Sequence, residues 1–111
     1  MKTYIISAFI LGAVTSTAQA EPTQYPLTIE NCGQEITFEN APDRVVSIGQ
    51  GGTELLYSLG LADVVKGTAL WRSDVWEQFA DVNAGIERLG DNEPSFESIV
   101  AKRPQLVIAD L

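Results

Sequence analysis

The sequence predicts an α/β fold in which an N-terminal β-hairpin precedes a parallel-sheet lobe built from βαβ units. Three observations lead to this prediction. Two short segments near residue 32 alternate apolar and polar residues, short apolar runs alternate with helix-patterned segments from residue 44 onward, and the last apolar run is nearly continuous. Strands that alternate with helices at this spacing are typical of βαβ units and a parallel, Rossmann-like sheet.

Residues 1–20 are predicted to be a cleaved secretory signal. Lys2 gives a short positive start, and the apolar run at residues 4–14 is too short to span a bilayer. Ala18-Gln19-Ala20 has the small-x-small pattern that signal peptidase cleaves, so we expect cleavage after Ala20 and export. A buried helix or a membrane anchor is the alternative, but polar residues interrupt the run.

The mature chain is predicted to be small and acidic. The 111 residues less the twenty of the signal leave 91, and loss of Lys2 leaves six basic against fifteen acidic residues. Nucleic acid and anionic lipid are poor partners for this surface, because counterion release requires clustered Lys and Arg. Cys32 is the only cysteine and histidine is absent, which argues against a zinc or haem-iron site with those ligands.

Residues 21–41 are predicted to form the hairpin segment. Leu27-Thr28-Ile29 and Ile36-Thr37-Phe38 each alternate apolar and polar residues, and Asn31-Cys32-Gly33-Gln34 between them supplies turn residues. The pattern breaks before Pro42, so the parallel lobe is expected to occupy residues 42–111.

The lobe is predicted to begin with a strand, Val45-Val46-Ser47-Ile48, and a helix over residues 53–59. The three leucines of this helix, Leu55, Leu56 and Leu59, are expected to share its buried face, and Gly60 ends it. A second strand is expected to run from residue 64 to residue 70.

Two more helices and a last strand complete the predicted lobe. Ser73-Asp74 is expected to start a helix that carries four apolar side chains at helical spacing and ends near Gly85. Ser95 is expected to cap a third helix, which Pro104 prevents from continuing. The apolar run at residues 106–109 is typical of a parallel strand that helices cover on both faces.

The glycines between the first lobe strand and its helix raise the question of phosphate binding. A dinucleotide fingerprint requires Gly-x-Gly-x-x-Gly, whereas Gly49-Gln50-Gly51-Gly52-Thr53-Glu54 has glutamate at the third glycine position. Glu54 is also expected to direct a carboxylate toward the helix N-terminus, where a pyrophosphate would lie. The sequence therefore argues against phosphate and predicts a ligand-binding turn, although a tight turn alone explains the glycines equally well.

Several short segments occur in order along the predicted lobe: Pro42-x-Arg44-Val45-Val46-Ser47-Ile48, Thr53-Glu54-Leu55-Leu56, Leu59-Gly60-Leu61-Ala62-Asp63-Val64-Val65-x-Gly67, Leu89-Gly90 with Pro94-Ser95-Phe96-Glu97-Ser98-Ile99, and Lys102-x-Pro104-x-Leu106-Val107-Ile108. This ordered set resembles the amino-terminal lobe of periplasmic iron-complex and cobalamin binding proteins, the substrate-binding components of ABC importers. The preceding hairpin resembles the strand pair that many iron-complex members carry.

The resemblance implies a periplasmic protein of two α/β lobes, joined by one long helix, with the ligand in the cleft between them. It implies capture of an iron–siderophore complex and delivery to a permease and ATPase, without catalysis, a cofactor or membrane insertion. Haem and cobalamin are the alternative ligands; the loop that contains Trp71 has no tyrosine or histidine for haem iron. Only the first lobe is present, so we expect a fragment or a truncated product.

The resemblance assigns ligand contacts to three loops. These contacts are Gln50, Gly51 and Gly52 after the first strand, Trp71 and Arg72 after the second, and Asp91 and Asn92 before the third helix. Trp71 is expected to stack on a planar ligand and Arg72 to pair with an anionic chelate. The alternatives are core packing for Trp71 and an ordinary solvated side chain for Arg72.

Glu97 occupies the position at which the resembling proteins dock onto permease arginines. Its alternative explanation is the helix dipole, which favours a first-turn glutamate by about 0.3–1 kcal/mol. A small secreted α/β enzyme is the rival class of function, but no histidine is present to act as a base and no Gly-x-Ser-x-Gly elbow occurs. Asp91 with Glu93 is the remaining carboxylate pair, and a solvated loop explains it. The sequence therefore predicts no catalytic or metal-binding residues.

Overall fold

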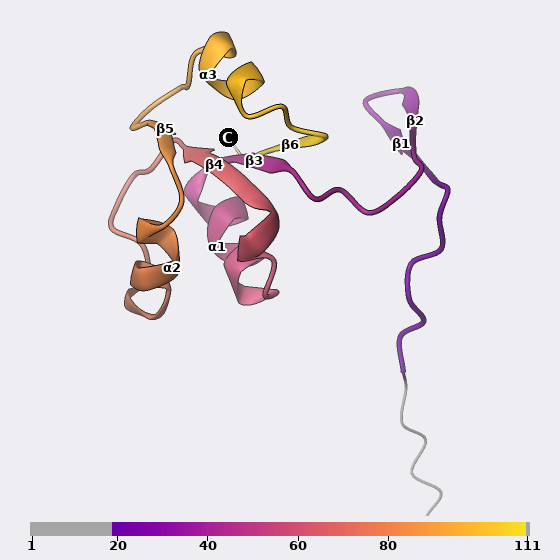
Figure 1. Cartoon of the computed structure of the whole chain (residues 1–111), viewed down its shortest axis with the longest axis horizontal. Coiled ribbons are helices and arrows are strands. Elements are labelled where there is room, and N and C mark those ends of the chain that lie inside the picture. The colour runs from indigo at the N-terminus through magenta and orange to yellow at the C-terminus, as the bar shows by residue number, and fades with distance from the viewer. Residues whose placement is uncertain (1–18, 111) are drawn as a thin grey trace, which may run out of the picture.

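The computed structural model describes residues 19–110 and has the α/β architecture shown in Figure 1. The predicted signal therefore lies almost wholly outside the described residues. The elements, in chain order, are β1 (Leu27–Asn31), β2 (Gln34–Phe38), β3 (Val45–Ile48), α1 (Gln50–Ser58), the 3-10 helix η1 (Ala62–Val64), β4 (Val65–Ala69), the 3-10 helix η2 (Glu77–Phe79), α2 (Ala80–Ala84), β5 (Arg88–Gly90), α3 (Phe96–Ala101) and β6 (Leu106–Ala109).

The strands form two separate sheets, which confirms the predicted fold class. β1 and β2 form a two-stranded antiparallel sheet, and the other four strands form a sheet of order β5-β4-β3-β6. Every neighbouring pair in the larger sheet is parallel. β3 lies inside this sheet with β4 and β6 on its two sides, so the carboxyl ends of all four strands reach the same edge.

The hairpin forms where the sequence predicts it. Cys32 and Gly33 at its tip both have positive φ, 51° and 75°, as a two-residue type I′ turn requires. Ile29 lies opposite Ile36 in the antiparallel register. Figure 1 shows the hairpin set apart from the larger sheet, to which an extended segment connects it.

The helices lie on both sides of the larger sheet, with α1 and α2 on one face and α3 on the other (Figure 1). The core is on the α1 side, where buried side chains of the sheet and helix meet. Its buried members are Val45, Leu56, Tyr57, Val65 and Trp71. The α3 side is thinner, because α3 has only six residues and Phe96 at its start is 75% exposed.

Helix α1 differs from its prediction in both start and orientation. It begins at Gln50, three residues before the predicted start, so Gly51 and Gly52 belong to its first turn. Leu56 is buried as predicted, whereas Leu55 and Leu59 are 59% and 63% exposed. The polar neighbours of Leu56 on the helix, Thr53 and Glu54, are buried instead. Their hydrogen bonds to nearby backbone explain why the apolar pattern alone gave the wrong face.

The later elements agree with the prediction in part. Ser95 caps α3 as predicted, because its Oγ accepts a hydrogen bond from the N–H of Ser98 at 3.1 Å. The second predicted helix starts late, at η2 and α2, because the N–H of Ser73 donates to Gln50 Oε1 at 3.1 Å and the chain there is not helical. The short strand β5 was not predicted. β6 forms as predicted, but helices do not cover both of its faces, because Val107 on the α3 side is exposed.

A substitution of Gly49, in the turn between β3 and α1, tests how strongly the fold constrains this position. Gly49 has φ 114°, and a Cβ there would collide with the carbonyl oxygen of Asp110. We expect Gly49→Ala to lower the free energy of unfolding by about 2 kcal/mol or more, from backbone strain and overpacking together. Gly60→Ala is the matched control, because Gly60 has φ 74° but nothing within 4 Å of the added Cβ. Urea unfolding that gives equal losses for the two variants would contradict this account.

Candidate functional site

The predicted contact residues come together at the carboxyl edge of the larger sheet. This edge receives the turns that follow β3, β4 and β5. The N–H of Arg72 donates to Gln50 Oε1 at 3.3 Å, and the N–H of Trp71 donates to the carbonyl of Asp91 at 3.1 Å. These bonds link the three loops side by side, as the sequence predicts for residues at the ends of parallel strands.

A cavity of about 390 Å³ opens at this edge between the β3, β4 and β6 turns. It combines backbone, carboxylate, guanidinium and aromatic surfaces. Its lining residues are Gly49, Gln50, Gly51, Glu54, Leu70, Arg72, Ser73, Trp76 and Asp110. Of the seven predicted contacts, only Gln50, Gly51 and Arg72 line it.

The glycines of this turn bring α1 close to Asp110. A Cβ on Gly51 would lie 2.5 Å from Asp110 Oδ2, and a Cβ on Gly52 would lie 3.5 Å from the Asp110 Cβ. The N–H of Gly52 donates to Asp110 Oδ2 at 3.2 Å. The chain therefore places its own carboxylate at the N-terminus of α1, where the helix dipole favours negative charge.

The Glu54 carboxylate bonds Gln50 and the loop after β4 rather than the free amides at the start of α1, where it was expected to compete with a phosphate. Its side chain is 6% exposed, and Oε1 accepts hydrogen bonds from the N–H of Trp76 at 3.0 Å and from Gln50 Nε2 at 3.1 Å. Because α1 starts at Gln50, Glu54 lies one turn inside the helix. The carboxylate beside the first turn of α1 is that of Asp110, the last residue that the structure describes.

Trp71 lies in the core, so the core-packing alternative describes it and the stacking interpretation does not. The side chain is 9% exposed, and its Nε1 donates to Thr68 Oγ1 at 3.1 Å. The guanidinium of Arg88 lies over the ring, 5.2 Å from its centroid. With one face beneath Arg88 and the residue buried, the ring offers little surface to a planar ligand.

Trp76 is the exposed aromatic side chain of the cavity. It is 57% exposed and stacks on Phe79, with ring centroids 6.2 Å apart and an interplanar angle of 16°. Phe79 in turn meets Tyr57 edge to face at 5.7 Å. The chain therefore connects the cavity surface to the core through three aromatic rings.

Asp91 and Asn92 face solvent beside the cavity without lining it. The carboxylate of Asp91 lies 3.1 Å from Arg88 Nη1, an exposed ion pair worth less than about 1 kcal/mol. The carbonyl of Asn92 accepts from the N–H of Leu70 at 3.1 Å. The backbone of this loop thus supports the loop after β4.

Six cavity residues were not among the predicted contacts: Gly49, Glu54, Leu70, Ser73, Trp76 and Asp110. Asp110 could have been found from its position, because it is a charged residue directly after an apolar parallel strand. Ser73 was assigned to a helix start and Trp76 to a buried helical face, so the incorrect helix boundary concealed both.

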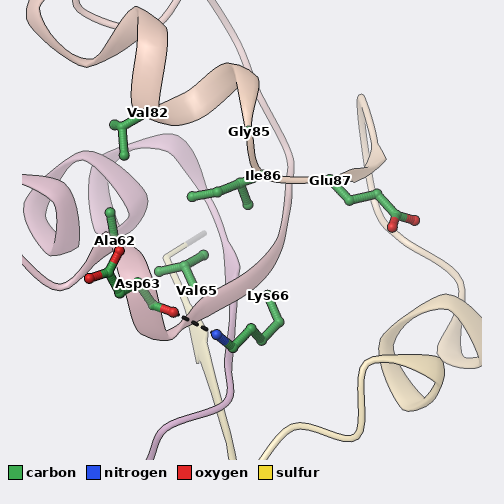
Figure 2. Close-up of a pocket in the computed structure, with 8 residues that line it drawn as sticks. All are labelled: Ala62, Asp63, Val65, Lys66, Val82, Gly85, Ile86 and Glu87. Atoms are coloured by element: carbon green, nitrogen blue, oxygen red, sulfur yellow. Dashed lines mark hydrogen bonds between the residues drawn. The ribbon is translucent and has the colours of Figure 1, made fainter.

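A second recess, of about 490 Å³, lies at the opposite, amino edge of the sheet (Figure 2). Val65, Val82 and Ile86 point into it, while Lys66 Nζ donates to the carbonyl of Asp63 at 2.6 Å. The Glu87 carboxylate is paired with Lys102. Two of the three charged side chains of this recess, Lys66 and Glu87, therefore have partners of their own. Within residues 19–110, no group of three or more His, Cys, Asp or Glu side chains is placed to hold a metal ion.

Comparison with known proteins identifies the family of the chain. Residues 45–111 match the family described as periplasmic binding protein. The chain belongs to this family. Its members are binding proteins rather than enzymes, in agreement with the predicted class of function. No helix within residues 19–110 has the length and apolar character needed to cross a bilayer.

Curated relatives of this periplasmic binding protein come from Bacillus subtilis. One, named "Uncharacterized ABC transporter substrate-binding lipoprotein YvrC", is 30% identical over 95 residues, which are 85% of this chain and 29% of the relative. Another, named "Probable siderophore-binding lipoprotein YfiY", is 25% identical over 112 residues, 99% of this chain and 34% of the relative. The chain therefore spans about a third of the length of these relatives.

Solved structures of other periplasmic binding proteins share the fold. An ABC-type Fe3+-hydroxamate transport system from Saccharomonospora viridis is 30% identical, with a TM-score of 0.63 over 76% of this chain and 32% of the other. The iron uptake substrate-binding protein PiuA from Streptococcus pneumoniae is 26% identical, with a TM-score of 0.59 over 81% of this chain and 31% of the other. A periplasmic binding protein from Veillonella parvula is 26% identical, with a TM-score of 0.63 over 73% and 28%.

Tyr57, beside Glu54 on α1, provides a pH-dependent test of this packing. Burial, with the Glu54 charge as a second cause, raises the pKa of Tyr57 from 10.0 to about 12. The folded state therefore holds the hydroxyl proton of Tyr57 more tightly than the unfolded state does. The stability that this proton contributes is complete below pH 10 and is lost as the pH rises toward 12. We expect urea midpoints to fall more steeply across this window in the natural protein than in Tyr57→Phe, which cannot ionise. Parallel pH profiles would show that Tyr57 is not the group responsible.

Proposed function

We propose that this chain supplies one wall of the ligand cleft in the substrate-binding component of an ABC importer, and that the cargo is an iron–siderophore complex. The observation that carries the proposal is the open cavity at the carboxyl edge, where Arg72 and Trp76 face solvent together. Open α/β sheets bind ligands at this edge. The names of the relatives support the cargo class, since they refer to siderophore binding, Fe3+-hydroxamate transport and iron uptake.

The contact set that we propose differs from the one that the resemblance implied. Arg72 remains, because its exposed guanidinium lines the cavity and can pair with oxygen atoms of a chelate. Trp76 takes the aromatic role expected of Trp71, because its ring is accessible. Gly51 contributes backbone, and Asp91 and Asn92 are retained at the rim, where they can reach a large ligand.

The chain is proposed to act outside the cytoplasm, in the periplasm. The signal predicted at residues 1–20 supports this location, as do the lipoprotein names of the relatives. A permease and an ATPase are the proposed partners, because the relatives are named as ABC transporter components. Since the chain spans about a third of the relatives, the cargo and the partners of the whole protein form part of this proposal.

A titration of the chain from residue 21 onward tests the proposed cargo. Four ligands would be added separately, namely ferrioxamine B, a ferric chelate of the catecholate class, haem and cobalamin. Binding would be measured by calorimetry, with tryptophan fluorescence as a second signal. We expect a ferric siderophore to bind and Arg72→Ala to weaken it about fivefold or more, because a charge-assisted contact contributes of order 1 kcal/mol. Arg103→Ala, an exposed arginine at the opposite edge, should leave affinity unchanged. Exclusive binding of haem or cobalamin would reassign the cargo, and no binding at all would remove the ligand claim.

We also propose that Glu97 docks the protein onto its permease. Glu97 is exposed in the first turn of α3, beside the 75% exposed ring of Phe96. An accessible carboxylate next to an apolar anchor suits a partner that presents arginine.

Uptake measured in cells tests the docking role separately from binding. Glu97→Ala is expected to reduce siderophore-dependent iron uptake several-fold while affinity for the chelate stays unchanged, because no residue of α3 lines the carboxyl-edge cavity. Glu35→Ala on the hairpin is the control for loss of an exposed glutamate. Unchanged uptake in Glu97→Ala would remove this role.

A further inference from the structure

We propose that Gln50 is a positioning residue rather than a ligand contact, and that with Glu54 it forms a latch that fixes the loop after β4. The latch is defined as the side chains of Gln50 and Glu54 and their bonds to residues 72–76. Its consequence for ligand affinity rests on the proposed function, whereas its effect on the loop does not.

The carboxamide of Gln50 is fully engaged within the chain. Its Oε1 accepts from the N–H of Arg72 at 3.3 Å, from the N–H of Ser73 at 3.1 Å and from Ser73 Oγ at 3.2 Å. Its Nε2 donates to Glu54 Oε1 and to the carbonyl of Asp74, both at 3.1 Å. A primary amide has two N–H donors and two acceptor lone pairs. No donor of Gln50 remains for a cargo, and its acceptor capacity is also taken.

Glu54 completes the latch from one turn further along α1. Its Oε1 accepts from the N–H of Trp76 at 3.0 Å as well as from Gln50 Nε2. The side chain is buried, and a buried carboxylate is tolerated only when hydrogen bonds compensate the loss of water. Because an ionised acceptor strengthens each bond, the contact to Trp76 is a strong one.

The loop between β4 and η2 is held at its start by the N–H groups of Leu70 and Trp71, which donate to the carbonyls of Asn92 and Asp91, and beyond that point by the latch. Residues 70–76 include neither helix nor strand, so their backbone groups gain no support from a regular ladder. The latch binds this backbone at four positions, residues 72, 73, 74 and 76. Two of these anchored residues, Arg72 and Trp76, project exposed side chains that line the cavity.

The latch therefore ties the shape of the cavity to the first turns of α1. Gln50 and Glu54 are four residues apart, so both reach the loop from the same side of the helix. A loop that is already ordered loses less entropy when a cargo binds, and this preorganisation raises affinity without any direct contact.

Amide hydrogen exchange measured by NMR decides whether the latch exists. In Gln50→Ala we expect the protection of the Arg72 and Ser73 amides to fall about tenfold, since each loses its acceptor. In Glu54→Ala the Trp76 amide should lose protection, and Glu54→Gln, which keeps an acceptor oxygen, should restore much of it. Gln78→Ala, an exposed glutamine of η2, is the matched control. Amides of the β3–β4 ladder report whether each variant is folded.

Unchanged protection at Arg72 and Ser73 in a folded Gln50→Ala would overturn the latch. Affinity for ferrioxamine B then separates positioning from contact. If the latch positions the loop, Glu54→Ala weakens binding together with Gln50→Ala, although Glu54 is buried, and Glu54→Gln restores it. A loss confined to Gln50→Ala would make Gln50 a direct contact and contradict the proposal. If the natural chain binds no chelate while the exchange pattern appears as expected, the proposed function fails and the latch stands.

Discussion

The parallel pairing of β3 with both β4 and β6 is the constraint on which the rest of the structure depends. Parallel strands run in the same direction, so each turn that leaves the carboxyl end emerges beside its neighbours. Ile48 pairs with Ala69 on one side and with Ala109 on the other. This register brings the turn after β3 within hydrogen-bonding distance of the loop after Ala69 on one side and of Asp110 on the other, and the cavity is the space that they enclose.

Much of this arrangement could be predicted from the sequence, because backbone patterns report it directly. The hairpin follows from alternation around a turn that tolerates positive φ, and β3, β4 and β6 follow from their apolar runs. The capping role of Ser95 follows from local chemistry alone. The shared edge also follows, since it needs only the order of strands and the parallel rule. Elements set by local signals were therefore predictable.

The incorrect assignments concern groups whose partners lie far away in the sequence. Glu54 resembles an exposed helix residue until its bond to the N–H of Trp76 is seen, so the leucine pattern indicated the wrong face of α1. Trp71 resembles a ligand-stacking residue until Arg88 is found over its ring. Sequence spacing cannot show which polar groups form hydrogen bonds within the chain. At this site many of them do.

The carboxylate of Asp110 at the first turn of α1 has a consequence for how cargo charge is recognised. Many anion sites use the fixed backbone amides of a helix start, which demand one ligand outline. Here that position is filled from within, so under the proposed function the negative oxygens of a chelate meet the guanidinium of Arg72 instead. A guanidinium on a long side chain can donate to acceptor oxygens at different places, and recognition of this kind tolerates a range of chelate shapes.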